Sequence, residues 1–296
     1  MLKLGLVGLG AWGRQHQRVL QQLHDEGKLE LVFAEDLEYG ADVDLNLVDA
    51  VDFVTPANTH YEQAKTALER GKHVFVEKPM TLDRGEAIDL VSYSEEVGKI
   101  LAVGHQFRFS WALQQVQKEL HRGMRTPAYL TFRYIHSDRP PRTDMGAIFN
   151  FGSHLFDMLL FIFGRLPDDL LCSAVYLLGN RDREDAALVW TRYGRDVALL
   201  ELGWTHPIRA RDIWLIEGGR KLYADLAANS IEWFMPKSLG REVGDETELL
   251  YKELEHFVFC CDHGSRPIND CRIGADAVLL CEAALVSAKE NKVIKL

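Results

Sequence analysis

Residues 3–13 read Lys-Leu-Gly-Leu-Val-Gly-Leu-Gly-Ala-Trp-Gly, and this stretch decides the fold of the first part of the chain. An apolar strand pattern runs directly into Gly8-x-Gly10-x-x-Gly13, which opens a helical pattern. In such a loop the first glycine permits the tight turn, the second lets the backbone approach a pyrophosphate, and the third lets helix and strand pack closely. The free N–H groups and positive dipole end of the helix favour phosphate. We predict a dinucleotide-binding loop, the alternative being a turn that binds no ligand. The contacts expected from it are Gly8, Gly10, Ala11, Trp12 and Gly13.

The same alternation of strand and helix patterns continues to about residue 105. Apolar strands that alternate with helices are typical of parallel βαβ units. Strands are expected at Lys3–Val7, Leu29–Ala34, Ala50–Thr55, His73–Val76 and Ile100–Val103, and helices at Trp12–His24, Tyr61–Arg70 and Asp83–Val97. The acidic segment Asp36–Asp49 has no clear helical period, so we expect its crossover helix to be missing or reduced.

From about residue 126 the pattern becomes one of successive strands with tight connections at 193–196 and 217–220, which are hairpin signals. The expected elements are strands at Ala128–His136, Leu170–Leu178, Ala186–Arg192, Val197–Trp204, Asp212–Ile216, Lys221–Asp225, Ser230–Phe234 and Val293–Leu296, with helices near Glu246–Asp262 and Arg272–Asn291. The predicted fold class is α/β: an N-terminal Rossmann parallel sheet and a C-terminal α+β domain with an open, mostly antiparallel sheet. We predict a cofactor-binding domain at 1–122 and a substrate-binding and oligomerisation domain at 123–296.

Composition limits the classes of function. The chain has 296 residues, 34 basic and 44 acidic, for a formal net charge of −10. Hydrophobic residues make up 47% and charged residues 26%, which excludes a disordered chain. A negative surface repels the phosphate backbone, so we expect no nucleic-acid partner.

We expect a cytoplasmic protein with no membrane partner and no metal. The start of the chain lacks the pattern of a secretory signal, and the most apolar stretch, Leu155–Phe163, is too short to span a bilayer. The five cysteines form no Cys-x-x-Cys pair, so a disulfide framework or thiolate zinc site is not expected and a reducing cytosol fits.

The ends of the second and third strands carry candidate cofactor contacts. An acidic residue about 20 residues beyond the glycine loop takes the ribose hydroxyls in such folds. Asp36 and Glu35 both qualify by position, and a carboxylate there favours NAD over NADP; the alternative is a solvated loop acid. Past the third strand, the predicted cofactor contacts are Thr55, Pro56, Asn58 and His60. Asn58 or Thr59 also suits a helix cap, which is compatible with cofactor contact.

The fourth strand ends in Glu77-Lys78-Pro79, at the edge where ligands of open α/β sheets collect. Glu77 and Lys78 are predicted cofactor contacts. A lysine there can also hold a substrate hydroxyl and stabilise charge on its oxygen. Taken alone, a lysine at such a place is more often a surface lysine.

Five segments in order resemble the glucose-fructose oxidoreductase / inositol dehydrogenase (Gfo/Idh/MocA) family. They are Gly8–Gly13, Thr55–His60, Glu77–Pro79, Val103–Phe109 and Gly146–Asp157. The resemblance covers essentially the whole chain, and its specific elements are Glu-Lys-Pro and Gly-x-His-x-x-Asp. It implies oxidation of a secondary alcohol on a sugar, cyclitol or sugar nucleotide with NAD or NADP, or the reverse. It also implies oligomer contacts through the C-terminal sheet, and we expect a homodimer or homotetramer.

By this resemblance Lys78 is the catalytic lysine and His154 the general base, with the substrate between the nicotinamide and the sheet. Alcohol oxidation requires loss of a hydroxyl proton, and histidine suits that step because its ordinary pKa lies near 6.5. Without the resemblance, His154 would be interpreted as a core histidine on an apolar helix.

Further predicted substrate contacts are Arg108, Asn150 and Asp157. Asp157, three residues after His154, either orients the imidazole or supports the helix. Many family members carry Asp at the place of Asn150, and an amide holds an imidazolium less strongly than a carboxylate does. Some sugar-nucleotide-oxidising branches also carry Asn there, so activity is not excluded. Arg139 and Arg142 are alternative anion contacts, although any single arginine also serves solubility.

Two alternatives to a dehydrogenase stay open. A catalytically silent dinucleotide-binding sensor is suggested by Asn150 and the short 36–49 segment. A glycoside-cleaving enzyme that keeps NAD tightly bound is the other. The substrate is a small molecule in each enzymatic case.

Overall fold

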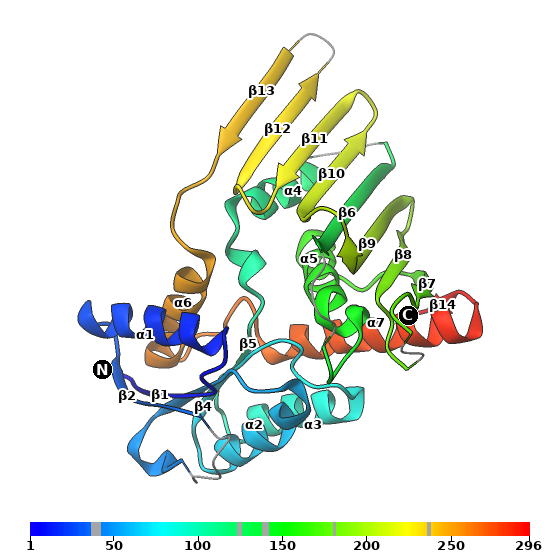
Figure 1. Cartoon of the computed structure of the whole chain (residues 1–296). Helices are drawn as coiled ribbons and strands as arrows, with labels where there is room; N and C mark the ends of the chain where they lie inside the picture. Colours follow the sequence, from blue (N-terminus) through cyan, green and yellow to red (C-terminus); the bar gives the residue numbers. More distant parts are fainter. Residues whose placement is uncertain (37–42, 123–125, 138–141, 180–181, 236–237) are drawn as a thin grey trace. The chain divides into compact units, whose positions relative to one another are not determined.

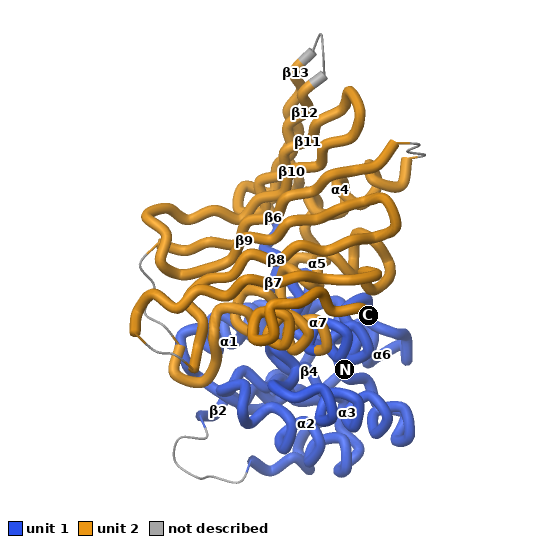
Figure 2. The backbone as a smooth tube through the Cα atoms, turned by 90° about the vertical axis from the view of Figure 1, so that its right-hand side faces the viewer, with its two compact units in different colours: residues 1–106, 247–278 blue, residues 107–246, 279–296 orange. Residues whose placement is uncertain are grey.

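The computed structural model describes residues 1–36, 43–122, 126–137, 142–179, 182–235 and 238–296 (Figure 1). The chain divides into two compact units (Figure 2). Unit 1 contains residues 1–106 and 247–278, and unit 2 contains residues 107–246 and 279–296. The functional domains predicted at 1–122 and 123–296 stay a prediction.

Unit 1 is built on a five-stranded sheet in which all strand pairs are parallel. The strands are β1 (Lys3–Val7), β2 (Glu30–Glu35), β3 (Ala50–Phe53), β4 (His73–Val76) and β5 (Leu101–Val103), in the order β2-β1-β3-β4-β5. Strands β3, β4 and β5 are almost entirely buried, which is why their sequences are continuous apolar runs. The predicted parallel sheet is therefore confirmed.

Helices connect these strands as the sequence predicts. They are α1 (Gly13–Asp25), α2 (His60–Glu69) and α3 (Arg84–Glu96), with 3-10 turns η2 (Leu45–Leu47) and η3 (Ala57–Thr59). Within residues 43–49, the described part of the β2–β3 connection, η2 is the only helical turn. The remainder of the acidic segment, residues 37–42, lies outside the described residues.

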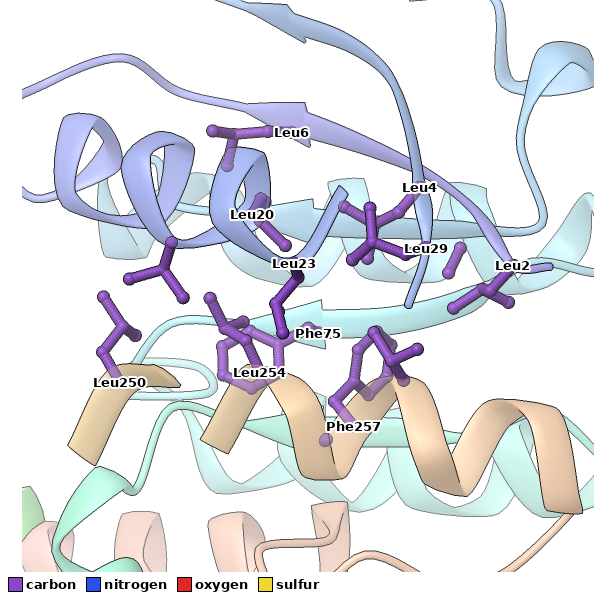
Figure 3. Close-up of a cluster of buried hydrophobic side chains, with 14 residues drawn as sticks. Leu2, Leu4, Leu6, Leu20, Leu23, Leu29, Phe75, Leu250, Leu254 and Phe257 are labelled. Carbon is purple, nitrogen blue, oxygen red and sulfur yellow. The ribbon is translucent and has the colours of Figure 1, made fainter. Parts of the chain in front are cut away.

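A helix from far along the chain completes the core of unit 1 (Figure 3). Helix α6 (Leu249–His263) places Leu250, Leu254 and Phe257 in one buried cluster with Leu20 and Leu23 of α1. Burial of such side chains stabilises each by about 1.5–3 kcal/mol relative to exposure. The core of unit 1 is thus packed in part by residues from late in the chain.

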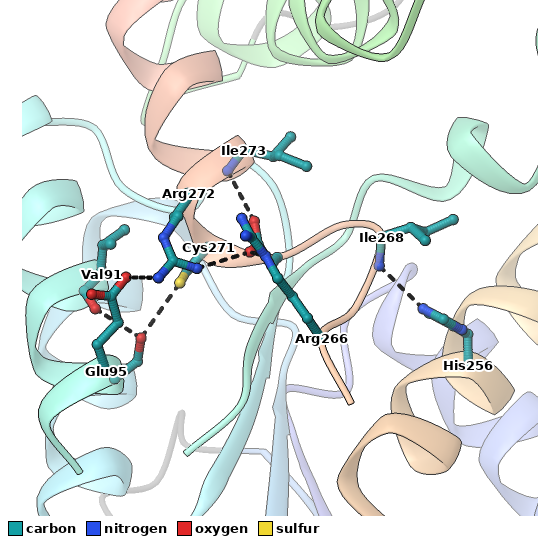
Figure 4. Close-up of polar contacts among 10 residues, drawn as sticks. Val91, Glu95, His256, Arg266, Ile268, Cys271, Arg272 and Ile273 are labelled. Atoms are coloured by element: carbon teal, nitrogen blue, oxygen red, sulfur yellow. Dashed lines mark hydrogen bonds and ion pairs between the residues drawn. The ribbon is translucent and has the colours of Figure 1, made fainter. Parts of the chain in front are cut away.

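The segment after α6 is also fixed to unit 1 (Figure 4). Asn269 donates from Nδ2 to the carbonyl of Val103, 2.7 Å away, and Asp270 pairs with Arg266 and Arg272. Arg272 also pairs with Glu95 on α3. These contacts fix the start of α7 (Cys271–Glu290), a helix that begins in unit 1 and ends in unit 2.

Unit 2 is built on a nine-stranded sheet, antiparallel except for the pair β6–β9. Its order is β13-β12-β11-β10-β6-β9-β8-β7-β14. The strands are β6 (Ala128–Ser137), β7 (Asp169–Val175), β8 (Ala186–Tyr193), β9 (Asp196–His206), β10 (Ala210–Glu217), β11 (Arg220–Asp225), β12 (Ser230–Met235), β13 (Ser238–Val243) and β14 (Ile294–Lys295). The sequence patterns predicted all of these except β13.

Helices pack on one face of this sheet. They are α4 (Trp111–His121) and α5 (Ser153–Phe163), preceded by the turns η4 (Gln106–Phe109) and η5 (Ile148–Gly152), the latter a π-helical turn. The side chains of Gln117 and His121 on α4 contact the last carbonyls of α5, at Phe161 and Ile162. Helix α5 is buried on nearly every side, so its mostly apolar sequence is that of a core helix.

Candidate functional site

The glycine loop joins β1 to α1. Gly8 has a φ of +102°, and a Cβ atom there would lie 2.4 Å from the carbonyl oxygen of Val54. A Cβ atom on Gly13 would lie 1.9 Å from the carbonyl oxygen of Gly8. Gly10 differs, because a Cβ atom there meets nothing within 4 Å. Gly8 and Gly13 therefore make the turn, whereas Gly10 leaves open space beside the backbone, which suits a phosphate group.

The start of α1 presents an indole beside this loop. Ala11 and Trp12 are exposed, and Trp12 stands at the N-cap position without a side-chain cap. The Trp12 ring is 39% exposed and donates from Nε1 to Oε1 of Glu77 over 2.8 Å. Glu77, at the end of β4, thus fixes the indole next to the glycine loop.

Glu77 belongs to a buried cluster of ionisable groups that the sequence analysis missed. His16 on α1 lies between two carboxylates, with Nδ1 2.7 Å from Oδ2 of Asp52 and Nε2 3.3 Å from Oε1 of Glu77. The other oxygen of Glu77 accepts the backbone N–H of Lys78 over 3.0 Å. The sequence did contain a signal for His16: it follows Gly13 by three residues, so the two share the helix face that packs against the sheet.

The electrostatics of the cluster follow from burial and charge. Burial opposes the charge of His16, but Asp52 and Glu77 together raise its pKa to about 10. Burial raises the pKa of Asp52. Burial alone would also raise the pKa of Glu77, yet the hydrogen bond and charge of His16 lower it overall. His16 is therefore an imidazolium at neutral pH.

His60 joins the two loops at the carboxyl edge of the sheet. Its Nδ1 lies 2.8 Å from the carbonyl oxygen of Pro79, and its Nε2 lies 3.0 Å from that of Thr55. The ring is 1% exposed, so its described contacts are structural ones that hold the loop after β3 against the Lys78 loop. Pro56 and Asn58 in the same loop are exposed, and Lys78 is partly exposed.

The predicted capping of α2 by Thr59 or Asn58 is wrong. Thr59 occupies the N-cap position, but it makes no side-chain cap hydrogen bond. Its backbone is already helical because η3 runs directly into α2, and its hydroxyl donates instead to the carbonyl of Pro56 over 2.7 Å. The hydroxyl of Thr55 donates to Oε1 of Gln63 over 2.6 Å.

Asp36 follows β2 directly and is exposed. The carbonyl of its neighbour Glu35 accepts the backbone N–H of Gly8 over 2.8 Å, which holds the end of β2 beside the glycine loop. Unit 1 thus brings together the glycine loop, Asp36, the Thr55–His60 loop and Lys78 at one edge of its sheet.

His154 lies on the first turn of α5 in unit 2, among aromatic rings. Its ring is stacked on Tyr134 of β6, with centroids 5.3 Å apart and planes 9° apart. Phe107 meets it edge-on at 5.2 Å. His154 is 5% exposed.

Arg108 and Asp157 contact each other. Nε of Arg108 lies 2.6 Å from Oδ1 of Asp157, and the two side chains are 6% and 1% exposed. Asp157 therefore anchors α5 to the η4 turn through Arg108. Its two predicted roles, orienting the imidazole and supporting the helix, stay predictions. Substrate contact by either residue stays a prediction.

Glu184 fixes the turn that leads to His154. Its Oε1 accepts the backbone N–H of Ile148 over 2.7 Å, and its carbonyl accepts that of Ala147 over 2.9 Å. A Cβ atom on Gly146 would lie 2.2 Å from this carboxylate. Asn150, 6% exposed, lies in the same turn, one helical turn before His154.

Three residues on the helix-facing side of the sheet also escaped the sequence analysis. Tyr134 and His136 alternate along β6, and Arg211 of β10 pairs in register with Tyr134. The Arg211 guanidinium lies 4.7 Å from the Tyr134 ring centroid and 3.3 Å from Nε2 of His136. The period-2 alternation of polar aromatic residues at 134 and 136 was the available signal.

Other candidates lie elsewhere. Arg142 forms an exposed ion pair with Asp144, and Arg139 lies outside the described residues. Among the described residues no group of three His, Cys, Asp or Glu side chains is arranged to hold a metal ion. In that same part of the chain no helix has the length and apolarity to cross a bilayer.

The sequence of this chain is similar to those of known oxidoreductases. Residues 2–105 match a family model described as GFO_IDH_MocA, an oxidoreductase family with an NAD-binding Rossmann fold. The chain is 31% identical over 203 residues to a UDP-N-acetylglucosamine 3-dehydrogenase of Acidithiobacillus ferrooxidans, covering 64% of this chain and 62% of the relative. It is 25% identical over 230 residues to a scyllo-inositol 2-dehydrogenase (NADP(+)) of Bacillus subtilis, covering 70% and 64%. The alignments thus span less than two thirds of these relatives.

Solved structures match over nearly the full length. The structure of UDP-N-acetylglucosamine 3-dehydrogenase from Acidithiobacillus ferrooxidans gives a TM-score of 0.87 at 24% identity and covers 98% of each chain. An inositol dehydrogenase homologue from Azotobacter vinelandii, in complex with NADH and myo-inositol, gives 0.85 at 15% identity and covers 100% and 97%. The predicted fold class is confirmed.

Proposed function

Because the chain belongs to the Gfo/Idh/MocA oxidoreductase family, we propose that it is an NAD(P)-dependent dehydrogenase acting on a secondary hydroxyl. The substrate class is a sugar, cyclitol, sugar nucleotide or related small polar molecule, in line with the names of the relatives. The observation that carries the proposal is the edge of unit 1, where Glu77 accepts hydrogen bonds from Trp12 of the glycine loop and from the backbone N–H of Lys78, and where Gly10 leaves open space.

The cofactor would be held by the glycine loop and the neighbouring strand ends. The open backbone at Gly10 and the start of α1 suit the pyrophosphate, and exposed Asp36 suits the ribose hydroxyls. A carboxylate there favours NAD, although one relative uses NADP(+) by name. When bound, the nicotinamide supplies the hydride acceptor.

Two side chains would act on the substrate hydroxyl. Lys78 would donate a hydrogen bond from its ammonium group and stabilise negative charge that develops on the oxygen. His154 would take the hydroxyl proton, as a group with an ordinary pKa near 6.5 can do at neutral pH. Lys78 belongs to unit 1 and His154 to unit 2, so their convergence on one substrate is part of the proposal.

We expect the outer face of the unit 2 sheet to bind a second copy of the chain. It exposes a group of apolar side chains on adjacent strands, among them Leu188 (58%), Leu199 (38%) and Tyr129 (38%). The proposed state is a homodimer or homotetramer, which light scattering after gel filtration would test.

The five cysteines form no disulfide, which supports a location in a reducing cytosol.

The test of the function is a screen followed by a substitution. A thermal-shift screen with NAD, NADP and a panel of sugars, cyclitols and sugar nucleotides should identify ligands that raise the melting temperature, since they bind the folded state. With the substrate found, Lys78→Ala should lower kcat by orders of magnitude and leave NAD affinity within a few-fold. Unchanged turnover would exclude this mechanism. NAD binding without turnover of any alcohol would instead favour the silent sensor, which the names of the relatives do not support.

A further inference from the structure

A chain of alternating acidic and basic side chains runs through unit 1. It consists of Asp52 on β3, His16 on α1, then Glu77 and Lys78 at the end of β4. Asp52 and His16 are 0% exposed, and Glu77 is 7% exposed. Burial of ionised groups is costly unless each one stabilises the next. The proposed reaction uses neither His16 nor Asp52, so their presence needs another explanation.

The carboxylate of Glu77 is the junction of this chain. Its Oε1 accepts from the Trp12 indole over 2.8 Å and lies 3.3 Å from Nε2 of His16, while its Oε2 accepts the Lys78 backbone N–H over 3.0 Å. An ionised carboxylate only accepts hydrogen bonds, whereas a protonated carboxyl would also have to donate one. The donors at both oxygens of Glu77 therefore fit its ionised form. The space beside it is closed, because a Cβ atom on Gly104 would lie 2.6 Å from Oε1.

We propose that His16 is a positioning residue for Lys78: its positive charge keeps Glu77 ionised, and Glu77 holds both Lys78 and the Trp12 indole beside the glycine loop. The significance for turnover rests on the proposed function, because that function gives Lys78 its role. The charge relation among His16, Glu77 and Lys78 exists whether or not an alcohol is oxidised.

The charged groups that act on His16 come from two elements. Asp52 faces it from β3 and Glu77 from the end of β4, and both hold its proton. The described ring contacts of His16 are with uncharged rings: Trp12 just before α1, and Phe75 of β4, the latter backed by Phe257 of α6. Neutralising His16 therefore leaves two buried carboxylates without the cation between them.

The first test measures the titration of Lys78 in His16→Gln. In the full-length protein, lysines are reductively methylated with ¹³C-formaldehyde, and the Lys78 signal is assigned by its loss in Lys78→Arg. Without the imidazolium, the pKa of Glu77 rises, so Glu77 takes up a proton at a higher pH than in the wild type. The Lys78 methyl signals should report this protonation as a titration step displaced upward by about one pH unit. The acidic limb of the kcat profile should move to higher pH with it.

Asp52→Asn provides the second test. Without Asp52, His16 loses the largest charge that holds its proton, so it should titrate within the assay range. The variant should behave like the wild type at pH 6 and like His16→Gln at pH 9. A merely structural role for the cluster would give a loss of kcat that is independent of pH. His263→Gln, an exposed histidine on α6, is the matched control and should change neither measurement.

The outcomes separate this inference from the proposed function. An unchanged Lys78 titration in His16→Gln, with kcat lowered equally at every pH, would overturn the positioning role. A shifted Lys78 titration in a protein that oxidises no alcohol would support the inference and count against the dehydrogenase. Should His16→Gln fail to fold, the pH 6 and pH 9 behaviour of Asp52→Asn decides alone.

Discussion

Two buried histidines, His16 in unit 1 and His154 in unit 2, lie in opposite surroundings. His16 lies between two carboxylates that raise its pKa to about 10 and keep it charged. The described ring contacts of His154 are with Tyr134 and Phe107, whose faces carry no net charge. A histidine held between two carboxylates is a fixed cation, whereas the described rings around His154 bring no carboxylate of their own. The same residue type therefore suits two tasks, one holding charge and one moving a proton.

The largest expected effect tests the second task. His154→Gln should lower kcat by about 10²- to 10⁴-fold, the usual contribution of a general base, because the amide cannot accept the hydroxyl proton. Steady-state kinetics with the identified substrate would measure it, and thermal unfolding would check that the variant is folded. Retained turnover at pH 7 would break the comparison, since His154 would then be a core histidine.

Helix α5, which carries His154, is held in place by one buried ion pair. Arg108→Ala removes, from the η4 turn, the ion-pair partner of the Asp157 carboxylate on α5, which is 1% exposed. Removal of one member of such a pair costs about 3–5 kcal/mol of the free energy of unfolding. Urea unfolding would measure the loss. Arg142→Ala, which breaks the exposed pair with Asp144, is the control and should cost less than about 1 kcal/mol.

A matched pair of substitutions distinguishes the glycine that shapes the loop next to His16 from the glycine proposed to face a phosphate. Gly13→Ala forces a Cβ atom against the Gly8 carbonyl and should destabilise the fold by about 1–3 kcal/mol. Gly10→Ala meets open space and should leave the melting temperature of the free protein nearly unchanged. It should still weaken NAD binding, measured by calorimetry, because the added methyl enters the proposed phosphate space. Normal NAD affinity in Gly10→Ala would place the cofactor elsewhere.

The smallest effect is a dependence of stability on pH. The folded-state pKa of His16, about 10, lies above its ordinary value of 6.5. The ion pairs of His16 therefore contribute fully below pH 6.5, and their contribution is lost as the pH rises toward 10. The difference in unfolding free energy between wild type and His16→Gln should shrink over that range. A constant difference from pH 6.5 to 10 would show that His16 is not charged in the folded state.

Local patterns predicted the parts of the molecule whose cause is local. The glycine loop, the five parallel strands and the hairpins of unit 2 follow from apolar periodicity and turn residues close together in the chain. Strand β13 escaped because Ser238–Val243 lacks a run of apolar residues and depends on pairing with β12. The cap of α2 was wrong because η3 continues into the helix, which a search for capping residues does not detect.

The ionic cluster was missed for a different reason. His16, Asp52 and Glu77 are 36 and 25 residues apart along the chain. Nothing in the periodicity of Ala50–Phe53 marks Asp52 as fully buried, since its strand resembles a plain apolar run with one acidic residue. Only the parallel register, which pairs Asp52 with Leu6 and Phe75, places it against α1. The candidate residues at strand ends were easier to predict, because the carboxyl ends of parallel strands lie at one edge of the sheet.

The placement of Leu250, Leu254 and Phe257 against α1 has a consequence for how the molecule can be cut. A fragment ending at residue 122 retains the whole glycine loop and all five parallel strands but uncovers the leucine face of α1. Such a fragment should aggregate or bind no dinucleotide when expressed by itself. Coexpression of residues 247–278 as a separate peptide is the natural attempt at complementation. A parallel sheet whose core needs α6 from late in the chain is therefore not separable as one contiguous segment.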